Sequence, residues 1–114
     1  EMIIGEQENL KTVIFNPGES LDTLVEKLKK AINEFDNDFS HLLLVDIFGG
    51  SPSNATALLL AENYKISAVS GVNLPMLLEA LTERENTAAD MLVKQLKAAG
   101  NEGIIDITEA FSAE

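Results

Sequence analysis

The chain has 114 residues, which suits one domain with a hydrophobic core of its own. Its formal net charge of −11 argues against nucleic acid or an anionic membrane surface as the main partner. It contains no cysteine, which excludes disulfides and thiolate metal sites. We therefore expect residues 1–114 to form one cytoplasmic domain.

The first half of the chain predicts two strands separated by a helix. Residues Leu10–Phe15 are rich in β-branched and aromatic side chains, which favour a strand. After a turn at residues 16–19, Ser20 can cap a helix whose apolar residues recur at helical spacing up to Phe35. Leu42–Ile47 is almost entirely apolar, which is typical of a strand covered on both faces in a parallel sheet.

The second half alternates in the same way. In chain order it predicts a helix at Pro52–Glu62, a strand at Ile66–Ser70, a helix from Pro75, a helix ending at Gly100 and a strand at Ile104–Ile107. The resulting order, β-α-β-α-β-α-α-β, indicates an α/β fold. We expect an open, mostly parallel sheet of about four to five strands with helices on both faces. Ligands of such sheets bind beyond the carboxyl ends of the strands.

The loop after the second strand has the composition of an anion site. Gly49 and Gly50 allow positive φ and a close approach of the backbone to a ligand. Ser51 is a good N-cap, and Pro52 suits the first helical position. Together they would offer several free N–H groups at the positive end of a helix, enough to bind a phosphate group. An ordinary capped turn between strand and helix is the alternative.

Asp46 lies beside this loop and needs a cation. A buried carboxylate without a partner is costly, and a bound phosphate would also repel it. A histidine between the two would solve both problems, with one ring nitrogen on the carboxylate and the other facing the anion. A carboxylate bound by local backbone N–H groups is the alternative. The only histidine, His41, precedes Asp46 by five residues, or roughly 16 Å of extended strand, and cannot reach.

We therefore expect the histidine to come from a preceding strand outside residues 1–114. Residues 1–5, EMIIG, read like the last turn of a helix stopped by glycine, which agrees with such a preceding segment.

Two motifs carry a resemblance to a known family. VDIFGGSPSNATA at residues 45–57 and GVNLPMLLEAL at residues 71–81 resemble the IIA domain of the mannose-family bacterial phosphotransferase system (PTS). The resemblance implies a phosphocarrier that takes a phosphoryl group from the protein HPr on a histidine and passes it to a IIB component. That histidine ends the family's first strand, which has no counterpart in residues 1–114, so these residues alone are expected to be inactive.

The resemblance also implies roles for individual residues. Asp46 would orient the histidine, and the loop Gly49, Gly50 and Ser51 would hold the phosphoryl group. Asn73, on a neighbouring loop, is a weaker site candidate. No metal, nucleotide or other cofactor is implied.

The resemblance further implies a homodimer that exchanges the strand at 104–107. The exchanged strand is expected to run antiparallel, and packing of this strand onto its own sheet is the alternative. Phe48, Leu74 and Met76 flank the site loops and form either an apolar rim for HPr or part of the core.

Two other functions remain open. Asp46 itself could be phosphorylated, as in a response-regulator receiver domain, or the loop could serve a non-enzymatic, anion-binding regulatory module.

Overall fold

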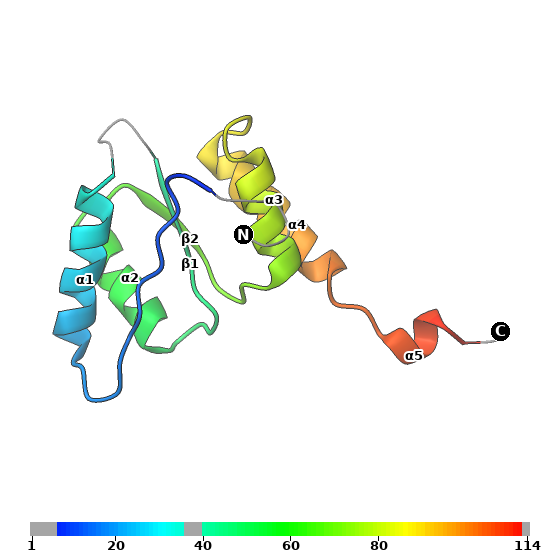
Figure 1. Ribbon diagram of the computed structural model, residues 1–114, viewed down its shortest axis with the longest axis horizontal. Coiled ribbons are helices and arrows are strands. Elements are labelled where there is room, and N and C mark those ends of the chain that lie inside the picture. The colour runs from blue at the N-terminus through cyan, green and yellow to red at the C-terminus, as the bar shows by residue number, and fades with distance from the viewer. Residues whose placement is uncertain (1–6, 36–39, 113–114) are drawn as a thin grey trace. The chain divides into compact units, whose positions relative to one another are not determined.

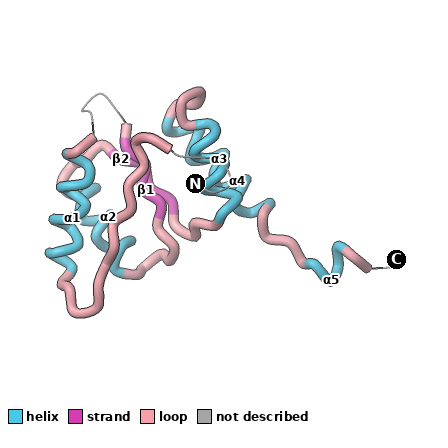
Figure 2. Tube along the Cα trace, in the orientation of Figure 1, coloured by secondary structure: helices cyan, strands magenta, loops and turns pink. Residues whose placement is uncertain are grey.

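The computed structural model describes residues 7–35 and 40–112 (Figure 1). It is a mixed α/β structure with several helices and a two-stranded sheet (Figure 2). The chain divides into two compact units, residues 1–71 and 72–114, and each is described by itself. Within the described ranges, every helix is too short or too polar to cross a membrane.

The first unit contains two helices and two strands. They are α1 (Leu21–Asn33), β1 (His41–Leu44), α2 (Ser51–Ala61) and β2 (Ile66–Val69). The predicted cap of α1 is confirmed, because the Ser20 hydroxyl accepts a hydrogen bond from the Thr23 N–H at 3.1 Å.

The two strands form a parallel pair, with α2 as the connection between them. His41 lies opposite Ile66 and Leu44 opposite Val69. The Gly71 N–H donates to the Asp46 carbonyl at 3.1 Å, so backbone contact continues past the carboxyl ends of both strands. This contact holds the start of the loop after β1 against the chain that follows β2.

The core of this unit lies between α1 and α2. It is formed by four buried residues, Leu24, Val25, Ala55 and Leu59. Around them pack seven partly buried residues, namely Val13, Leu21, Leu28, Ile32, Leu43, Tyr64 and Ile66. Because α2 supplies two of the four buried residues, burial of this helix fixes the position of the loop that leads into it.

The sequence prediction of a strand at Leu10–Phe15 is wrong for the described structure, in which this segment has no regular secondary structure. Val13 packs against the core, and the Lys27 ammonium donates to the Ile14 carbonyl at 2.9 Å. The β-propensity of a segment reflects its fit to a sheet, and none of the described strands pairs with this one. The described residues thus contain two strands where four to five were expected.

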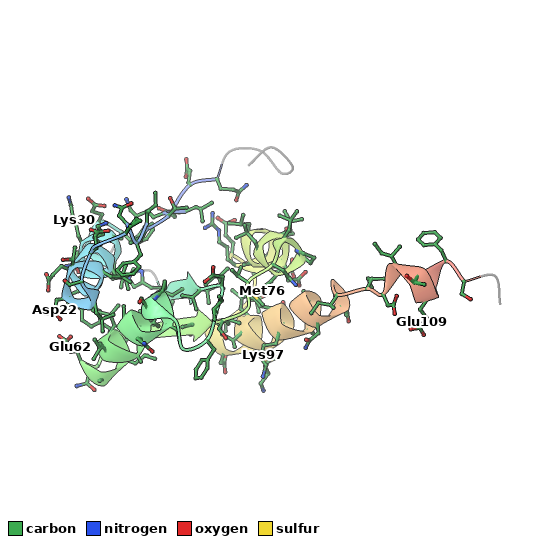
Figure 3. All side chains as sticks on the ribbon, turned by 90° about the horizontal axis from the view of Figure 1, so that it is seen from below. Asp22, Lys30, Glu62, Met76, Lys97 and Glu109 are labelled. Atoms are coloured by element: carbon green, nitrogen blue, oxygen red, sulfur yellow. The ribbon has the colours of Figure 1, made fainter. Side chains whose placement is uncertain are left out.

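The second unit is built from α3 (Leu74–Glu83), α4 (Ala89–Glu102) and α5 (Ile107–Ala110). α3 packs against α4, and the buried hydrophobic residues of the two helices are Met76, Ala80, Leu92 and Leu96. Met76 is labelled in Figure 3. α4 continues past Gly100, which does not adopt the positive φ of a helix stop, so the predicted end at Gly100 is wrong. A Cβ added at Gly100 or Gly103 would lie close to side chains of α3.

The predicted strand at Ile104–Ile107 is also absent from the structure. Residues 104–106 are irregular, and α5 begins at Ile107 because the Asp106 carboxylate accepts a hydrogen bond from the Glu109 N–H at 3.1 Å. The side chains of α5, drawn around Glu109 in Figure 3, are all exposed. An aspartate inside a short apolar run therefore starts a helical turn when no strand lies beside it.

We predict that Gly103→Ala destabilises the second unit by about 1–3 kcal/mol, the usual cost of overpacking. A Cβ at this position would lie 2.5 Å and 2.9 Å from two carbon atoms of the Pro75 ring, which cannot swing away. Gly100→Ala is the matched control, since its added Cβ meets the flexible end of Met76 at 2.9 Å and alanine favours a helix. Urea unfolding of both variants checks this, and equal stabilities would contradict it.

Candidate functional site

The loop between β1 and α2 is a tight turn followed directly by a helix. The Gly50 N–H donates to the Ile47 carbonyl at 3.3 Å, which closes a turn over residues 47–50. Gly49 has φ 89°, and this third position of the turn is where a type II turn requires positive φ. Gly50 has φ −76°, so the expectation of positive φ holds for Gly49 and is wrong for Gly50.

The first residue of α2 is Ser51, one position earlier than the sequence suggested. Gly50 is the N-cap in extended conformation, and its carbonyl accepts the Asn54 N–H at 2.9 Å. The Ser51 side chain makes no capping hydrogen bond, so its prediction as N-cap is wrong. Pro52 is the second residue of α2, one position later than expected, and still lies in the first turn, where a helix leaves its N–H groups unbonded.

The start of α2 offers backbone N–H groups to a ligand. The N–H groups of Gly49, Ser51 and Ser53 make no hydrogen bond within the described parts of the chain, whereas that of Gly50 is used in the turn. No acidic side chain lies in the first turn of α2, although the chain carries a net charge of −11. The positive end of this helix dipole is therefore not neutralised by a carboxylate within its own first turn.

Asp46 follows the end of β1 by two residues and is exposed, so the expectation of a buried carboxylate is wrong for the described residues. Its backbone carbonyl accepts the Gly71 N–H at 3.1 Å, whereas its carboxylate has no hydrogen-bond partner among residues 7–35 and 40–112. The alternative of a carboxylate bound by local backbone N–H groups thus finds no support here. The Asp46 carboxylate is free to accept a hydrogen bond from an incoming group.

His41 lies at the opposite end of β1 from Asp46, as the sequence predicted. It is the first residue of the strand, and its ring lies 5.8 Å from that of Phe35. The structure therefore does not bring His41 to the loop that begins α2.

Asn73, the weaker site candidate, has a structural role in the second unit. Its Oδ1 accepts the Met76 N–H at 3.0 Å and so caps α3, and its Nδ2 donates to the Gly100 carbonyl at 3.0 Å. Both ends of the amide are thus engaged in joining α3 to α4. A role for Asn73 in the site stays a prediction.

The three proposed rim residues behave differently. In the first unit Phe48 is 85 % exposed, directly beside Gly49. In the second unit Leu74 is exposed, and Met76 belongs to the core, where sequence reasoning had left either role open.

Sequence reasoning missed Asn54, a residue of α2 whose side chain bonds to the loop. Its side-chain Nδ2 donates to the Gly49 carbonyl at 3.3 Å. A signal was present, because asparagine is a poor residue for the interior of a helix and tends to bond nearby backbone groups instead. The register of that bond depends on where α2 begins, which the sequence placed one residue late.

Comparison with known proteins places the chain in a family. Residues 1–97 match the family described as "PTS system fructose IIA component". The "PTS system fructose-specific EIIA component" of Bacillus subtilis is 46 % identical over 97 residues, which are 85 % of this chain and 66 % of that protein. The "PTS system mannose-specific EIIAB component" of Escherichia coli K12 is 39 % identical over 105 residues, 91 % of this chain and 32 % of that protein.

A solved structure agrees with these relatives. The crystal structure of the phosphotransferase system component EIIA from Streptococcus agalactiae matches with a TM-score of 0.85 at 32 % identity, covering 95 % of this chain and 83 % of that one. The chain spans about two thirds of the fructose-specific relative and about a third of the mannose-specific one. It belongs to the family of PTS IIA components, as the two sequence motifs indicated.

Proposed function

We propose that this chain is part of a phosphocarrier in a bacterial sugar phosphotransferase system. It accepts a phosphoryl group from phosphorylated HPr on a histidine and passes it to a IIB component during sugar uptake. The observation that carries this proposal is the family match over residues 1–97, which contains the whole loop from Asp46 to the start of α2. The unbonded N–H groups of that loop give the match a physical basis.

The chemistry follows from the geometry of the loop. A ring nitrogen of the histidine attacks the phosphorus in line as the bond from phosphorus to the HPr histidine breaks, and the leaving nitrogen keeps the electron pair. The N–H groups of Gly49 and Ser51 bind the oxygens of the transferring group. Asp46 accepts a hydrogen bond from the other ring nitrogen and stabilises the positive charge that develops on the ring. No metal or cofactor takes part in this proposal.

The histidine must come from outside the described residues. His41 lies at the wrong end of β1. The edge of β1 that faces away from β2 pairs with no strand in the described part of the chain. A further strand paired to that edge would end beside Asp46 if it ran parallel to β1. We propose that this strand carries the phosphorylated histidine, so that residues 1–114 alone are inactive.

The remaining expectations complete the proposal. Residues 1–114 belong to one IIA domain, which the family match supports by extending through both units. The protein is cytoplasmic, as an acceptor from HPr must be. It forms a homodimer, which the exposed apolar residues Ile104, Ile105, Ile107 and Phe111 support, because a second copy could bury them.

The full-length protein, incubated with phosphorylated HPr, is expected to gain one phosphate per chain. Intact mass spectrometry measures the gain, and alkali treatment identifies the product, because phosphohistidine survives alkali and an acyl phosphate does not. Residues 1–114 alone serve as the control and should gain none. An alkali-labile product would favour phosphorylation of Asp46 itself, and no product would favour the regulatory module.

Asp46→Asn in the full-length protein should slow phosphoryl transfer by roughly tenfold or more. A hydrogen bond to a charged group contributes about 1.5–3 kcal/mol, and the amide loses most of that contribution. The free energy of unfolding should stay within about 0.5 kcal/mol of wild type, because the side chain is exposed. Rapid-quench transfer kinetics and urea unfolding measure the two effects. An unchanged transfer rate would refute the role of Asp46.

Gly49→Ala should cost about 1–2 kcal/mol of stability, because a Cβ strains the backbone at φ 89°. It should also slow phosphoryl transfer, because the backbone at position 49 would rotate away from φ 89° to relieve the strain, and this rotation would reorient the N–H groups of the loop. Gly18→Ala is a matched control: Gly18 has φ 86°, lies before α1, and, like Gly49, has open space around an added Cβ. The two variants should lose similar stability, and only Gly49→Ala should transfer slowly. Equal transfer rates would show that the loop conformation is unimportant.

A further inference from the structure

We propose that Asn54 is a positioning residue of the phosphoryl site. Its side-chain amide holds the peptide between Gly49 and Gly50 and so directs the N–H groups of Gly49 and Ser51. This inference rests on the proposed function of the loop. It adds a side chain to a site that otherwise consists of backbone groups and one carboxylate.

The Gly49–Gly50 peptide is bonded at both of its ends. Its carbonyl oxygen accepts a hydrogen bond from Asn54 Nδ2 at 3.3 Å, and its N–H donates to the Ile47 carbonyl at 3.3 Å. A peptide group is planar, so bonds at its two ends fix the orientation of the plane. The N–H of Gly49 lies just before this plane, and that of Ser51 lies just after it. Both N–H groups are unbonded within the described residues and therefore available to a phosphoryl group.

Little else restrains this peptide. Gly49 has no side chain, and an atom added at its Cβ position would meet nothing within 4 Å. Glycine moves between many backbone conformations at low cost, so packing cannot hold the peptide at φ 89°. The two hydrogen bonds are its restraints, and Asn54 supplies the only one that comes from a side chain in the described structure.

Asn54 is well anchored for this task. Its own N–H donates to the Gly50 carbonyl at 2.9 Å, so the residue binds the consecutive carbonyls of both glycines. The next two residues, Ala55 and Thr56, are buried in the core of the first unit. The backbone at Asn54 is therefore fixed by the packing of the residues that follow it. The hydrogen bond from its side-chain amide to the Gly49 carbonyl then fixes the turn relative to that backbone. A reversed amide would place two oxygens together, so the donor assignment follows from the partner.

The test uses Asn54→Ala and Asn54→Asp in the full-length protein. Alanine removes the donor and favours the helix, whereas aspartate keeps the size, removes the donor and suits the positive end of α2. Neither change should unfold the protein, since Asn54 is exposed. Asn101→Ala is the matched control, because Asn101 is an exposed asparagine within α4 whose side chain makes no hydrogen bond in the described structure.

Two measurements are compared. Amide hydrogen exchange of the unphosphorylated protein reports how often the hydrogen bond from the Gly50 N–H to the Ile47 carbonyl opens. The Gly50 N–H should exchange roughly three- to tenfold faster in both Asn54 variants. Single-turnover transfer from phosphorylated HPr reports the function, and the rate at saturating HPr should fall by a similar factor. The HPr concentration for half-maximal rate should not change, because Asn54 orients groups at the transferring phosphoryl and does not contact HPr. Asn101→Ala should match wild type in every respect.

The outcomes separate this inference from the function on which it rests. Faster exchange together with slower transfer supports it. Unchanged exchange overturns it, as does faster exchange with wild-type transfer, and in the second case the phosphocarrier function stands. If wild-type protein takes up no phosphate, the proposed function fails and the role of Asn54 in transfer fails with it. The exchange result would then still decide whether Asn54 holds the turn.

Discussion

The burial of α2 is the constraint on which the first unit depends. Ala55 and Leu59 are completely buried against α1, and the partly buried Leu43 and Ile66 bring β1 and β2 to the same core. A close-packed interior leaves a helix little freedom to slide or rotate. The loop at the start of α2 is therefore positioned by the buried side chains of the helix that follows it. The packing of α2 thus both stabilises this unit and positions the loop that precedes the helix.

The electrostatics of the loop differ from those of the chain as a whole. A protein with net charge −11 repels anions at long range, yet α2 begins without an acidic residue in its first turn. Local N–H groups act over the length of a hydrogen bond, where they outweigh distant charges that solvent and salt screen. Asp46 is the exception beside this loop. In the proposed function, a histidine ring lies between the Asp46 carboxylate and the phosphoryl group, and the carboxylate stabilises the positive charge on that ring.

Two segments show how far β-propensity depends on a neighbouring strand. Leu10–Phe15 and Ile104–Ile107 have the composition of strands, and neither is one in the structure. The first is held by Val13 in the core and by Lys27 on the Ile14 carbonyl. The second segment ends in α5 instead, because the Asp106 side chain caps that helix. A strand requires hydrogen bonds from another strand, and a local pattern cannot supply them.

Local chemistry in the sequence was enough to predict helices α1 to α4, the parallel pair of β1 and β2, the Ser20 cap and the positive φ of Gly49. Each of these depends on residues close together in the chain or on a hydrophobic period. The two motifs were enough to predict the family. Only the tertiary structure showed that α2 starts at Ser51 and that the Gly50 N–H bonds to the Ile47 carbonyl. It also showed that the Asn54 side chain bonds to the Gly49 carbonyl, and that the Asn73 side chain connects α3 to α4. These features depend on where carbonyl groups point once the core has closed, and that direction is not encoded in any short stretch of residues.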